Sequence, residues 1–444
     1  LTREAVDSLR PLHNRMPVTF GPGDEASWLN PEADPAACLV GAGMGAEHDM
    51  SVATTKAFMR QFQEMGAELF IIDAGWVCPP TEGAIDWGGY NGLNIPNPDR
   101  YPNGLGELSD YCHSLGMKFA LWVEIERLGR LCPLHKEKPR WRKNNIFGEP
   151  DGGFIDLTDP EAAAWAENEL ARIITEYKLD LLRVDHNVSH NSYFHFTDAG
   201  AGVPECMALR HFDAVYKMYR NLKRRFPNVI FENCAGGGGR TDLGMMKAFH
   251  HTWVSDWQKL PRAALITNGM TMALPPERVD RLFAGMGSHP FGTLDAQMRN
   301  TMLTHMTLNV VSPAAAPWNP AQLEFVKHSV RVYKVFIRPI LPTCKVYHHT
   351  PEAEQALSDG KLILEIASPD GAKGAIGLFT LTNTPGADLC VVPRGVRTDL
   401  TYKVTADNSG AVCTVSGYEL LSGGFPARIP AALGSELLLY EAVL

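Results

Sequence analysis

Two stretches decide the fold: LFIID at Leu69–Asp73 and KFALWV at Lys118–Val123. Each is a short, nearly continuous apolar run that reaches a carboxylate at or just after its end, and a longer helical pattern separates the runs. Strands that are apolar along their whole length are typical of parallel sheets covered by helices on both faces. Similar runs recur at Cys38–Ala42, Asp180–Asp185, Val229–Asn233, Thr252–Asp256 and Thr307–Val311, with a weaker candidate at Met270–Leu274.

Seven or eight such units predict an α/β fold of the (β/α)8 barrel type, which typically needs ~250 residues. A doubly wound open sheet is the alternative. Helices are expected at Met50–Met65, Pro160–Tyr177 and Met207–Phe226, the second with Asp159 as its N-cap. After about residue 343, short strands with turn residues between them predict an antiparallel β-sandwich. We therefore expect a lead-in segment (1–37), a barrel (38–342) and a C-terminal β-sandwich domain (343–444).

The composition narrows the class of protein. The chain has 444 residues, 45% hydrophobic and 20% charged, which is typical of a globular protein. The net charge of −9 argues against a nucleic acid or an anionic membrane as partner. Nine scattered cysteines include no CxxC pair, and residues 1–15 lack an apolar leader, so we expect reduced thiols and a cytoplasmic location.

Carboxylates follow almost every predicted strand. The acids are Asp73, Glu124, Glu126, Asp185, Glu232 and Asp256. In barrel enzymes the chemistry takes place at the C-terminal ends of the strands, and a carboxylate is costly to bury without a partner. A single aspartate there is most often the N-cap of the next helix, but so many acids on one rim indicate a functional site.

Tryptophans accompany these acids. Trp76 and Trp257 lie just past strand ends, where they can face a ligand, whereas Trp122 and Trp253 are expected to pack in the barrel. Aromatic rings stack on the apolar faces of sugars, and carboxylates bind sugar hydroxyls. The pattern therefore favours a carbohydrate site, in which two carboxyl groups can cleave a glycosidic bond.

The run FENCAGGGGRTDLGMM (231–246) is the most specific motif. Four consecutive glycines after a strand allow the backbone to approach a ligand or another element closely. The run contains no GxxxxGK[ST] pattern and no lysine, so a phosphate loop has no support. Cys234 has no histidine partner nearby in sequence, which favours a thiol that lines the ligand site over a nucleophile.

Six ordered segments resemble glycoside hydrolase family 36, the bacterial α-galactosidase (melibiase) family of retaining α-glycosidases. They are FIIDAGW (70–76), ALWVEIERL (120–128), GFIDLTDPE (153–161), LDLLRVDHN (179–187), FENCAGGGGRTDLGMM (231–246) and HTWVSDW (251–257). The resemblance implies that Asp185 is the nucleophile and Asp256 the acid/base, with Glu124 left open as an alternative proton donor. It implies no metal and no organic cofactor. The candidate substrate-binding residues are Asp73, Trp76, Glu124, Arg183, Asn187, Cys234, Gly236 and Trp257.

Three positions depart from the family pattern. Ala74 replaces the second of two adjacent aspartates, Arg183 replaces a lysine, and Trp257-Gln258 replaces Asn-Thr. Each lost charged hydrogen bond costs ~1.5–3 kcal/mol. We therefore expect either that the glycone differs from plain galactose, with an amino- or acetamido-substituted galactose as one candidate, or that another loop supplies the missing contact. The family usually carries a large β-sandwich before the barrel, so this chain is expected to be cut or to represent a minimal branch.

Four interpretations of function remain open. The first is a retaining exo-α-glycosidase acting on terminal α-galactose-type sugars, and the second is an α-N-acetylgalactosaminidase. The third is a barrel that binds glycans without hydrolysing them, and the fourth is a metal-dependent lyase or isomerase using Asp73, Glu124 and Glu232. The expected partner is a carbohydrate substrate, with a homo-oligomer left open and neither nucleic acid nor membrane involved. His289 is expected to be structural.

Overall fold

Eight parallel strands close into a barrel in the order β10-β11-β12-β3-β4-β5-β8-β9. The structure is a computed structural model that describes residues 2–4, 15–17, 38–44, 50–80, 85–143, 153–187, 207–283, 292–309 and 319–443. The barrel strands are β3 (Gly41–Met44), β4 (Leu69–Ile72), β5 (Lys118–Val123), β8 (Leu181–Val184), β9 (Ile230–Asn233), β10 (His251–Trp253), β11 (Val279–Phe283) and β12 (His305–Asn309). The closed barrel confirms the predicted fold class and rules out the open sheet.

One predicted strand is wrong. Met270–Leu274 lies at the end of helix α9 (Arg262–Ala273) and just beyond it, and the strand of this unit is β11. The sequence VDRLF of β11 contains two charged residues, so it is not a continuous apolar run like most of the other strands. Both Asp280 and Arg281 are nevertheless buried, because their partners come from other strands and loops.

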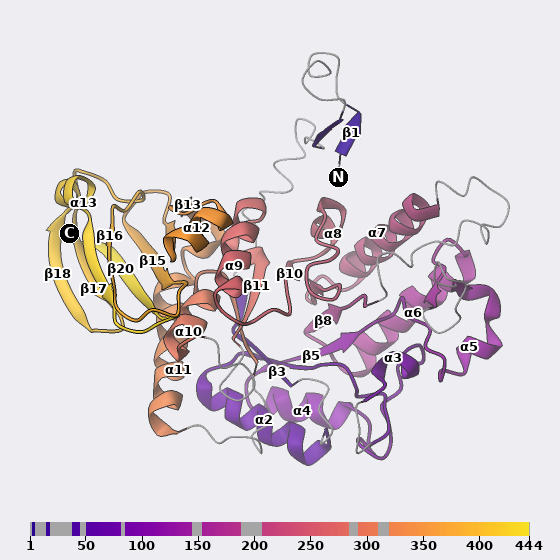
Figure 1. The fold of residues 1–444 in the computed structure, drawn as a ribbon. Helices are drawn as coiled ribbons and strands as arrows, with labels where there is room; N and C mark the ends of the chain where they lie inside the picture. The colour runs from indigo at the N-terminus through magenta and orange to yellow at the C-terminus, as the bar shows by residue number, and fades with distance from the viewer. Residues whose placement is uncertain are drawn as a thin grey trace.

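Helices surround the barrel (Figure 1). The helix α2 (Val52–Met65) begins at Ser51, whose side chain accepts a hydrogen bond from the Thr54 amide, and it packs beside α4 (Gly106–Ser114). The outer layer continues with α6 (Pro160–Glu176), α7 (Met207–Arg225), α8 (Leu243–Ala248), α9, α10 (Leu294–Met302) and α11 (Pro320–Val332). Asp159 caps α6 as predicted, accepting hydrogen bonds from the amides of Glu161 and Ala162.

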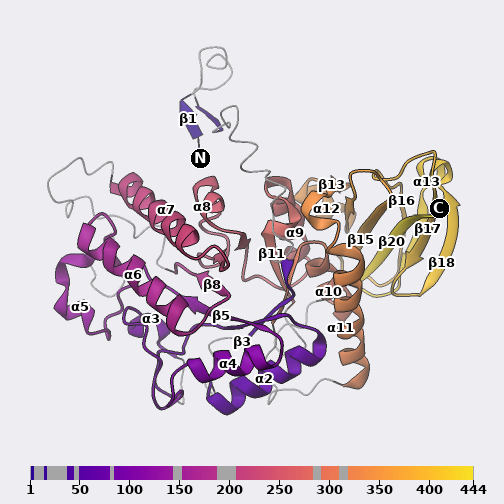
Figure 2. The ribbon, with the colours of Figure 1, turned by 180° about the vertical axis from the view of Figure 1, so that it is seen from behind.

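The C-terminal part is a six-stranded antiparallel sheet, ordered β13-β14-β15-β20-β17-β18, with a two-stranded sheet, β16-β19. The strands are β13 (Lys345–His348), β14 (Lys361–Ala367), β15 (Lys373–Thr380), β16 (Ala387–Val391), β17 (Thr401–Ala406), β18 (Ala411–Ser416), β19 (Phe425–Ile429) and β20 (Ser435–Val443). Both sheets contribute to one apolar core, as expected for a sandwich. Figure 2 shows this domain at one end of the molecule, beside α10 and α11. The predicted division at residues 37/38 and 342/343 stays a prediction.

Two further sequence features can be compared with the structure. Eight of the nine cysteines lie among the described residues, and all eight are free thiols, as expected. Within the described ranges, none of the helices combines the length and the apolar character needed to cross a membrane. The predicted role of His289 concerns a residue outside the described part of the chain.

Candidate active site

A cavity of about 230 Å³ lies at the C-terminal rim of the barrel strands. It is lined by Asp73, Ala74, Trp87, Trp122, Arg183, Asp185, Asn187, Cys234, Trp253 and Asp256. The three aspartates follow β4, β8 and β10, so they reach one rim because parallel barrel strands all end on the same side. The structure thus brings together six of the predicted site residues in one cavity: Asp73, Arg183, Asp185, Asn187, Cys234 and Asp256.

Asp185 is held by four hydrogen-bond donors. One carboxylate oxygen accepts from the amides of His186 (2.7 Å) and Gly236 (3.0 Å), and the other from Trp122 Nε1 (2.9 Å) and Asn187 Nδ2 (2.7 Å). The side chain is 7% exposed. Donors from three segments of the chain therefore fix the orientation of this carboxylate, which still faces the cavity.

Asp256 is held differently. It is exposed, and its Oδ1 accepts one hydrogen bond, from Trp253 Nε1 at 2.7 Å. An indole N–H thus binds each of the two candidate catalytic carboxylates, from Trp122 in β5 for one and from Trp253 in β10 for the other. The sequence pattern placed both tryptophans in the packing and missed these contacts. Trp253 lies three residues before Asp256, which was a usable signal, whereas Trp122 lies 63 residues from Asp185 and offered none.

The glycine run joins the two carboxylates. Gly236 has φ +51° and donates its amide to Asp185. A Cβ at Gly237, where φ is +84°, would lie 2.9 Å from Ser255 Cα and 3.0 Å from the Asp256 amide nitrogen. A Cβ at Gly238 would lie 2.3 Å from the Val254 carbonyl oxygen. The glycines are therefore required because this loop packs directly on the backbone that carries Asp256, which confirms the expected close approach.

This packing yields a testable prediction for Gly237→Ala. The added methyl group forces the Asp256 segment to move and strains the positive φ, so we expect a loss of stability of ~1–3 kcal/mol and a fall in activity. The matched control is Gly269→Ala in α9, where a Cβ meets nothing within 4 Å and helix propensity favours alanine. Urea denaturation and activity assays on both variants measure the difference. Equal behaviour of the two variants would contradict the packing argument.

Arg183 organises the floor of the cavity. Its Nε donates to Glu232 Oε1 (2.8 Å) and its Nη1 to Asp73 Oδ2 (3.1 Å), while the guanidinium carbon lies 4.2 Å from the Trp253 ring centroid. Burial raises the pKa of the Asp73 carboxyl, as do the Asp185 and Glu232 carboxylates, while Arg183 opposes the shift. Glu232 therefore acts as a partner of Arg183 inside the barrel and does not line the cavity.

Cys234 lines the cavity as predicted. Burial raises the pKa of its thiol well above the usual value, so the thiolate needed for nucleophilic attack is disfavoured. This geometry supports the interpretation of a lining thiol.

Four predicted residues lie outside the lining of this cavity: Trp76, Trp257, Glu124 and Gly236, the last of which still donates its amide to Asp185. Trp76 is 1% exposed, and it donates its indole N–H to the Trp122 carbonyl from within the core. The aromatic wall is instead formed by Trp87, Trp122 and Trp253, with Trp87 and Trp122 in edge contact at 5.5 Å. Trp257 is 41% exposed, and the Arg262 guanidinium carbon lies 4.6 Å from the centroid of its indole ring.

Glu124 also lies outside the lining of the cavity. It is fully buried and accepts hydrogen bonds from Asn91 Nδ2 and the Asn187 amide, with Arg127 Nη1 at 3.5 Å. Burial raises the pKa of its carboxyl to about 7. Because its side chain does not reach the cavity, Glu124 supports Asn187, and the geometry does not favour it as the proton donor.

One group of side chains in the described residues has the donor set of a metal site: His251, Asp280 and His305, whose potential ligand atoms lie within 4.8 Å of one another. The group is buried inside the barrel, with His251 Nε2 3.4 Å from Glu232 Oε2. A metal-dependent lyase or isomerase would need Asp73, Glu124 and Glu232 to converge on one metal ion. Instead, Asp73 and Glu232 pair with Arg183, and Glu124 binds two asparagines. The cavity geometry therefore does not support that interpretation.

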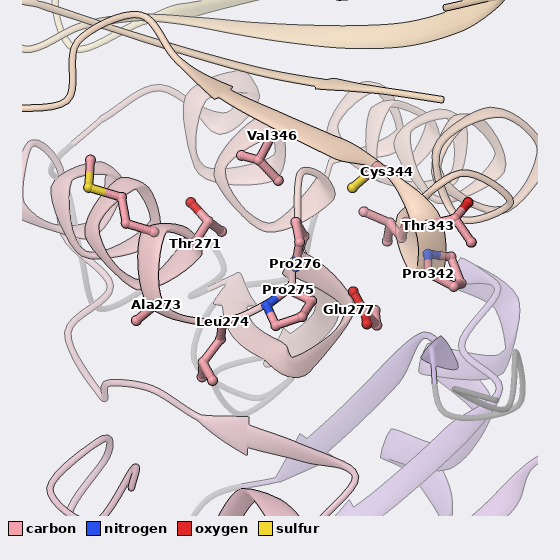
Figure 3. Close-up of a pocket in the computed structure, with 12 residues that line it drawn as sticks. Thr271, Ala273, Leu274, Pro275, Pro276, Glu277, Pro342, Thr343, Cys344 and Val346 are labelled. Atoms are coloured by element: carbon pink, nitrogen blue, oxygen red, sulfur yellow. The ribbon is translucent and has the colours of Figure 1, made fainter. Parts of the chain in front are cut away.

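A second cavity of about 350 Å³ lies between Thr271–Glu277 and the segment from Leu341 to Val346 (Figure 3). None of the predicted site residues lines it. Glu277 is 7% exposed there, its Oε2 has no hydrogen-bond partner, and burial raises its pKa to about 7.

Glu277 provides a prediction of pH-dependent stability. The pKa of its carboxyl is higher in the folded chain than in the unfolded chain, so folding favours the protonated form, and stability is lost as pH rises from about 4.5 to about 7. Glu277→Gln removes this loss. We expect the free energy of unfolding of the variant, relative to wild type, to be about 3 kcal/mol higher at pH 8 than at pH 4. Urea denaturation at both pH values measures it, and a pH-independent difference would contradict it.

Comparison with known proteins identifies the family. The Melibiase family model matches residues 35–330. The α-galactosidase of Escherichia coli is 32% identical over 217 residues, which are 48% of this chain and 29% of that protein. The crystal structure of the α-galactosidase from Lactobacillus brevis superposes with a TM-score of 0.80 at 22% identity, over 91% of this chain and 55% of that chain.

A second solved structure has the same fold. The GH36 α-galactosidase AgaA of Geobacillus stearothermophilus, solved in complex with stachyose, superposes with a TM-score of 0.79 at 19% identity, over 91% of this chain and 55% of that chain. The chain thus spans about half the length of these two structures and less of the Escherichia coli relative. Because the family model covers most of its length, the chain belongs to the melibiase family. The predicted resemblance to family 36 is confirmed.

Proposed function

We propose that this chain carries the catalytic site of a retaining exo-α-glycosidase that removes terminal α-linked galactose-type sugars. One observation carries the proposal: Asp185 and Asp256 line the same cavity, and an indole N–H binds each. The relatives named above are α-galactosidases, and AgaA was solved with stachyose, which supports an oligosaccharide substrate.

The proposed reaction has two displacement steps. In the first, an Asp185 oxygen bonds to the anomeric carbon while the bond from that carbon to the leaving oxygen breaks. The leaving oxygen keeps the electron pair and takes the proton of Asp256. In the second, Asp256 takes a proton from water as the water oxygen bonds to the anomeric carbon, and the ester bond to Asp185 breaks with its electron pair returning to the carboxylate. Two inversions give retention, and we predict a carboxyl separation of ~5–5.5 Å.

The arrangement of donors suits these different roles. Asp185 is buried and fixed by four donors, as a nucleophile aimed at one carbon requires. Asp256 is exposed and bound through one oxygen, so its other oxygen is available to exchange a proton with a leaving group or with water. Asp73, Arg183 and Asn187 supply polar groups for sugar hydroxyls, and the indole rings supply an apolar wall.

Ala74 favours a second candidate, an α-glycosidase with altered glycone specificity such as an α-N-acetylgalactosaminidase. Ala74 lines the cavity beside Asp73, and both Asp73 oxygens already accept hydrogen bonds, from the Ala74 amide and from Arg183. This corner therefore offers an apolar surface to one substituent of the sugar. An acetamido methyl group fits that chemistry.

A panel of aryl α-glycosides tests both candidates. It contains galactose, N-acetylgalactosamine, galactosamine, glucose and arabinopyranose as glycones, with kcat/KM measured for each. Selective hydrolysis of the galactoside supports the first candidate, and selective hydrolysis of the N-acetylgalactosaminide supports the second. Binding of a glycan without hydrolysis of any glycoside would contradict both and favour a glycan-binding barrel.

A further inference from the structure

Arg281 binds the backbone on both sides of Asp256. Its Nη1 donates to the Ser255 carbonyl oxygen (3.2 Å) and its Nη2 to the Trp257 carbonyl oxygen (2.8 Å). The side chain is fully buried. A planar guanidinium with two donors on one side is suited to span two acceptors in this way, and a lysine cannot reproduce the arrangement.

Arg281 reaches this segment from outside the barrel interior. Successive residues of a strand face opposite sides. Its neighbours in β11 both face inward, because Asp280 borders the interior group with His251 and Leu282 clusters with Cys234 and Trp253. Arg281 therefore faces the other side, where it touches the backbone of the Asp256 segment and does not line the cavity.

The Asp256 segment depends on such support more than the Asp185 segment does. Residues 254–259 form no helix or strand, and Asp256 itself is exposed with one side-chain hydrogen bond. Gly237 and Gly238 pack against one side of this backbone, and Arg281 binds the carbonyl groups that flank the aspartate.

We propose that Arg281 is a positioning residue for the acid/base, fixing the place of the Asp256 carboxyl by anchoring the two peptide groups around it. The inference rests on the proposed function. Arg281 takes no part in bond making or proton transfer. Its loss lets the carboxyl group move away from the leaving oxygen, and a displacement of ~1 Å can cost ~10²-fold in rate.

The dependence of rate on the leaving group tests this role. In kcat/KM, which reports the first step, a substrate with a poor leaving group such as an alkyl glycoside needs the proton of Asp256. A glycosyl fluoride or dinitrophenyl glycoside of the same sugar hardly needs it. For Arg281→Gln we expect kcat/KM to fall ~10–100-fold with the poor leaving group and less than ~3-fold with the good one. Arg281→Lys, which retains the charge and one donor nitrogen, should recover part of the loss.

Arg278→Gln is the matched control. Arg278 precedes the same strand and likewise donates to backbone carbonyls, those of Met246 and Phe249, away from Asp256. We expect its leaving-group dependence to equal that of wild type at a similar change in melting temperature. The proposal would be overturned if Arg281→Gln lost kcat/KM equally for both leaving groups. It would also be overturned if Arg281→Gln and Arg278→Gln showed the same dependence of kcat/KM on the leaving group. A wild-type chain inactive on every glycoside would instead contradict the proposed function.

Discussion

Replacing Asp185 with alanine lowers kcat/KM by roughly 10⁴–10⁶-fold, the scale seen when a covalent nucleophile is removed. No other carboxylate in the cavity can take its place, because Asp73 is engaged by Arg183 and Asp256 lies two strands away around the barrel. The loss should be in the chemical step, with binding of the sugar changed little. Steady-state kinetics on the preferred aryl glycoside and calorimetric binding of the free sugar measure the two effects separately.

Two controls accompany Asp185→Ala. The variant leaves Trp122 Nε1 and the Gly236 amide without their acceptor, so its melting temperature must be compared with that of wild type. Asp110→Ala removes an exposed aspartate paired with Lys178 and should retain full activity.

Azide rescue gives a further test of Asp185→Ala. Added azide can enter the space of the missing carboxylate and attack from that face, giving a glycosyl azide of inverted, β configuration. Residual activity within tenfold of wild type would contradict the assignment.

Replacing Asp256 with alanine produces the second-largest effect, and its size depends on the leaving group. The first step loses its proton donor, so kcat/KM for poor leaving groups should fall ~10²–10⁴-fold, while activated glycosides lose little. The second step loses its general base, so glycosyl-enzyme accumulates and kcat falls even with activated substrates. Pre-steady-state kinetics should therefore show a burst of aryl release followed by slow turnover.

Azide distinguishes the two aspartates. In Asp256→Ala it attacks the glycosyl-enzyme in place of water, needs no general base, and gives a glycosyl azide of retained, α configuration. Proton NMR of the product assigns the configuration. The same azide product from both variants, or uniform losses over all leaving groups in Asp256→Ala, would show that the roles of Asp185 and Asp256 are assigned wrongly.

Much of the fold could be predicted because most barrel strands are buried on both faces and carry apolar side chains throughout. The strand β11 could not be predicted in this way, because its charged residues Asp280 and Arg281 are stabilised by partners far away in sequence. Asp280 accepts a hydrogen bond from Thr307 and lies near His251, and Arg281 binds the Asp256 segment. A local pattern of hydropathy contains no information about such partners.

The sequence was sufficient to predict which strands are followed by acidic residues of the site. It was less informative about the direction in which each side chain points. Asp73, Asp185 and Asp256 lie at the cavity as predicted, since the first two follow a strand directly and Asp256 comes three residues after β10. Trp76 also follows a strand, yet it turns into the core. The residues that replace it, Trp87 and Trp122, come from the short helix α3 (Trp87–Tyr90) and from the neighbouring strand β5.

The departure at Arg183 has a local explanation in the structure. Its guanidinium binds Asp73 and Glu232 at once and lies against Trp253, which a lysine ammonium would do less well. The arginine thus ties together three rim and interior groups from β4, β9 and β10. This network explains why an arginine fits the position, while the identity of the glycone depends on the panel described above.

Trapping the covalent intermediate tests directly whether Asp185 is the nucleophile of a retaining glycosidase. A 5-fluoro glycosyl fluoride of the preferred glycone slows the second step more than the first, so the glycosyl-enzyme accumulates and peptide mass spectrometry locates the sugar. We expect one sugar per chain, attached to Asp185, and no labelling in Asp185→Ala. Attachment to another residue, or turnover with inversion and no attached sugar, would contradict it.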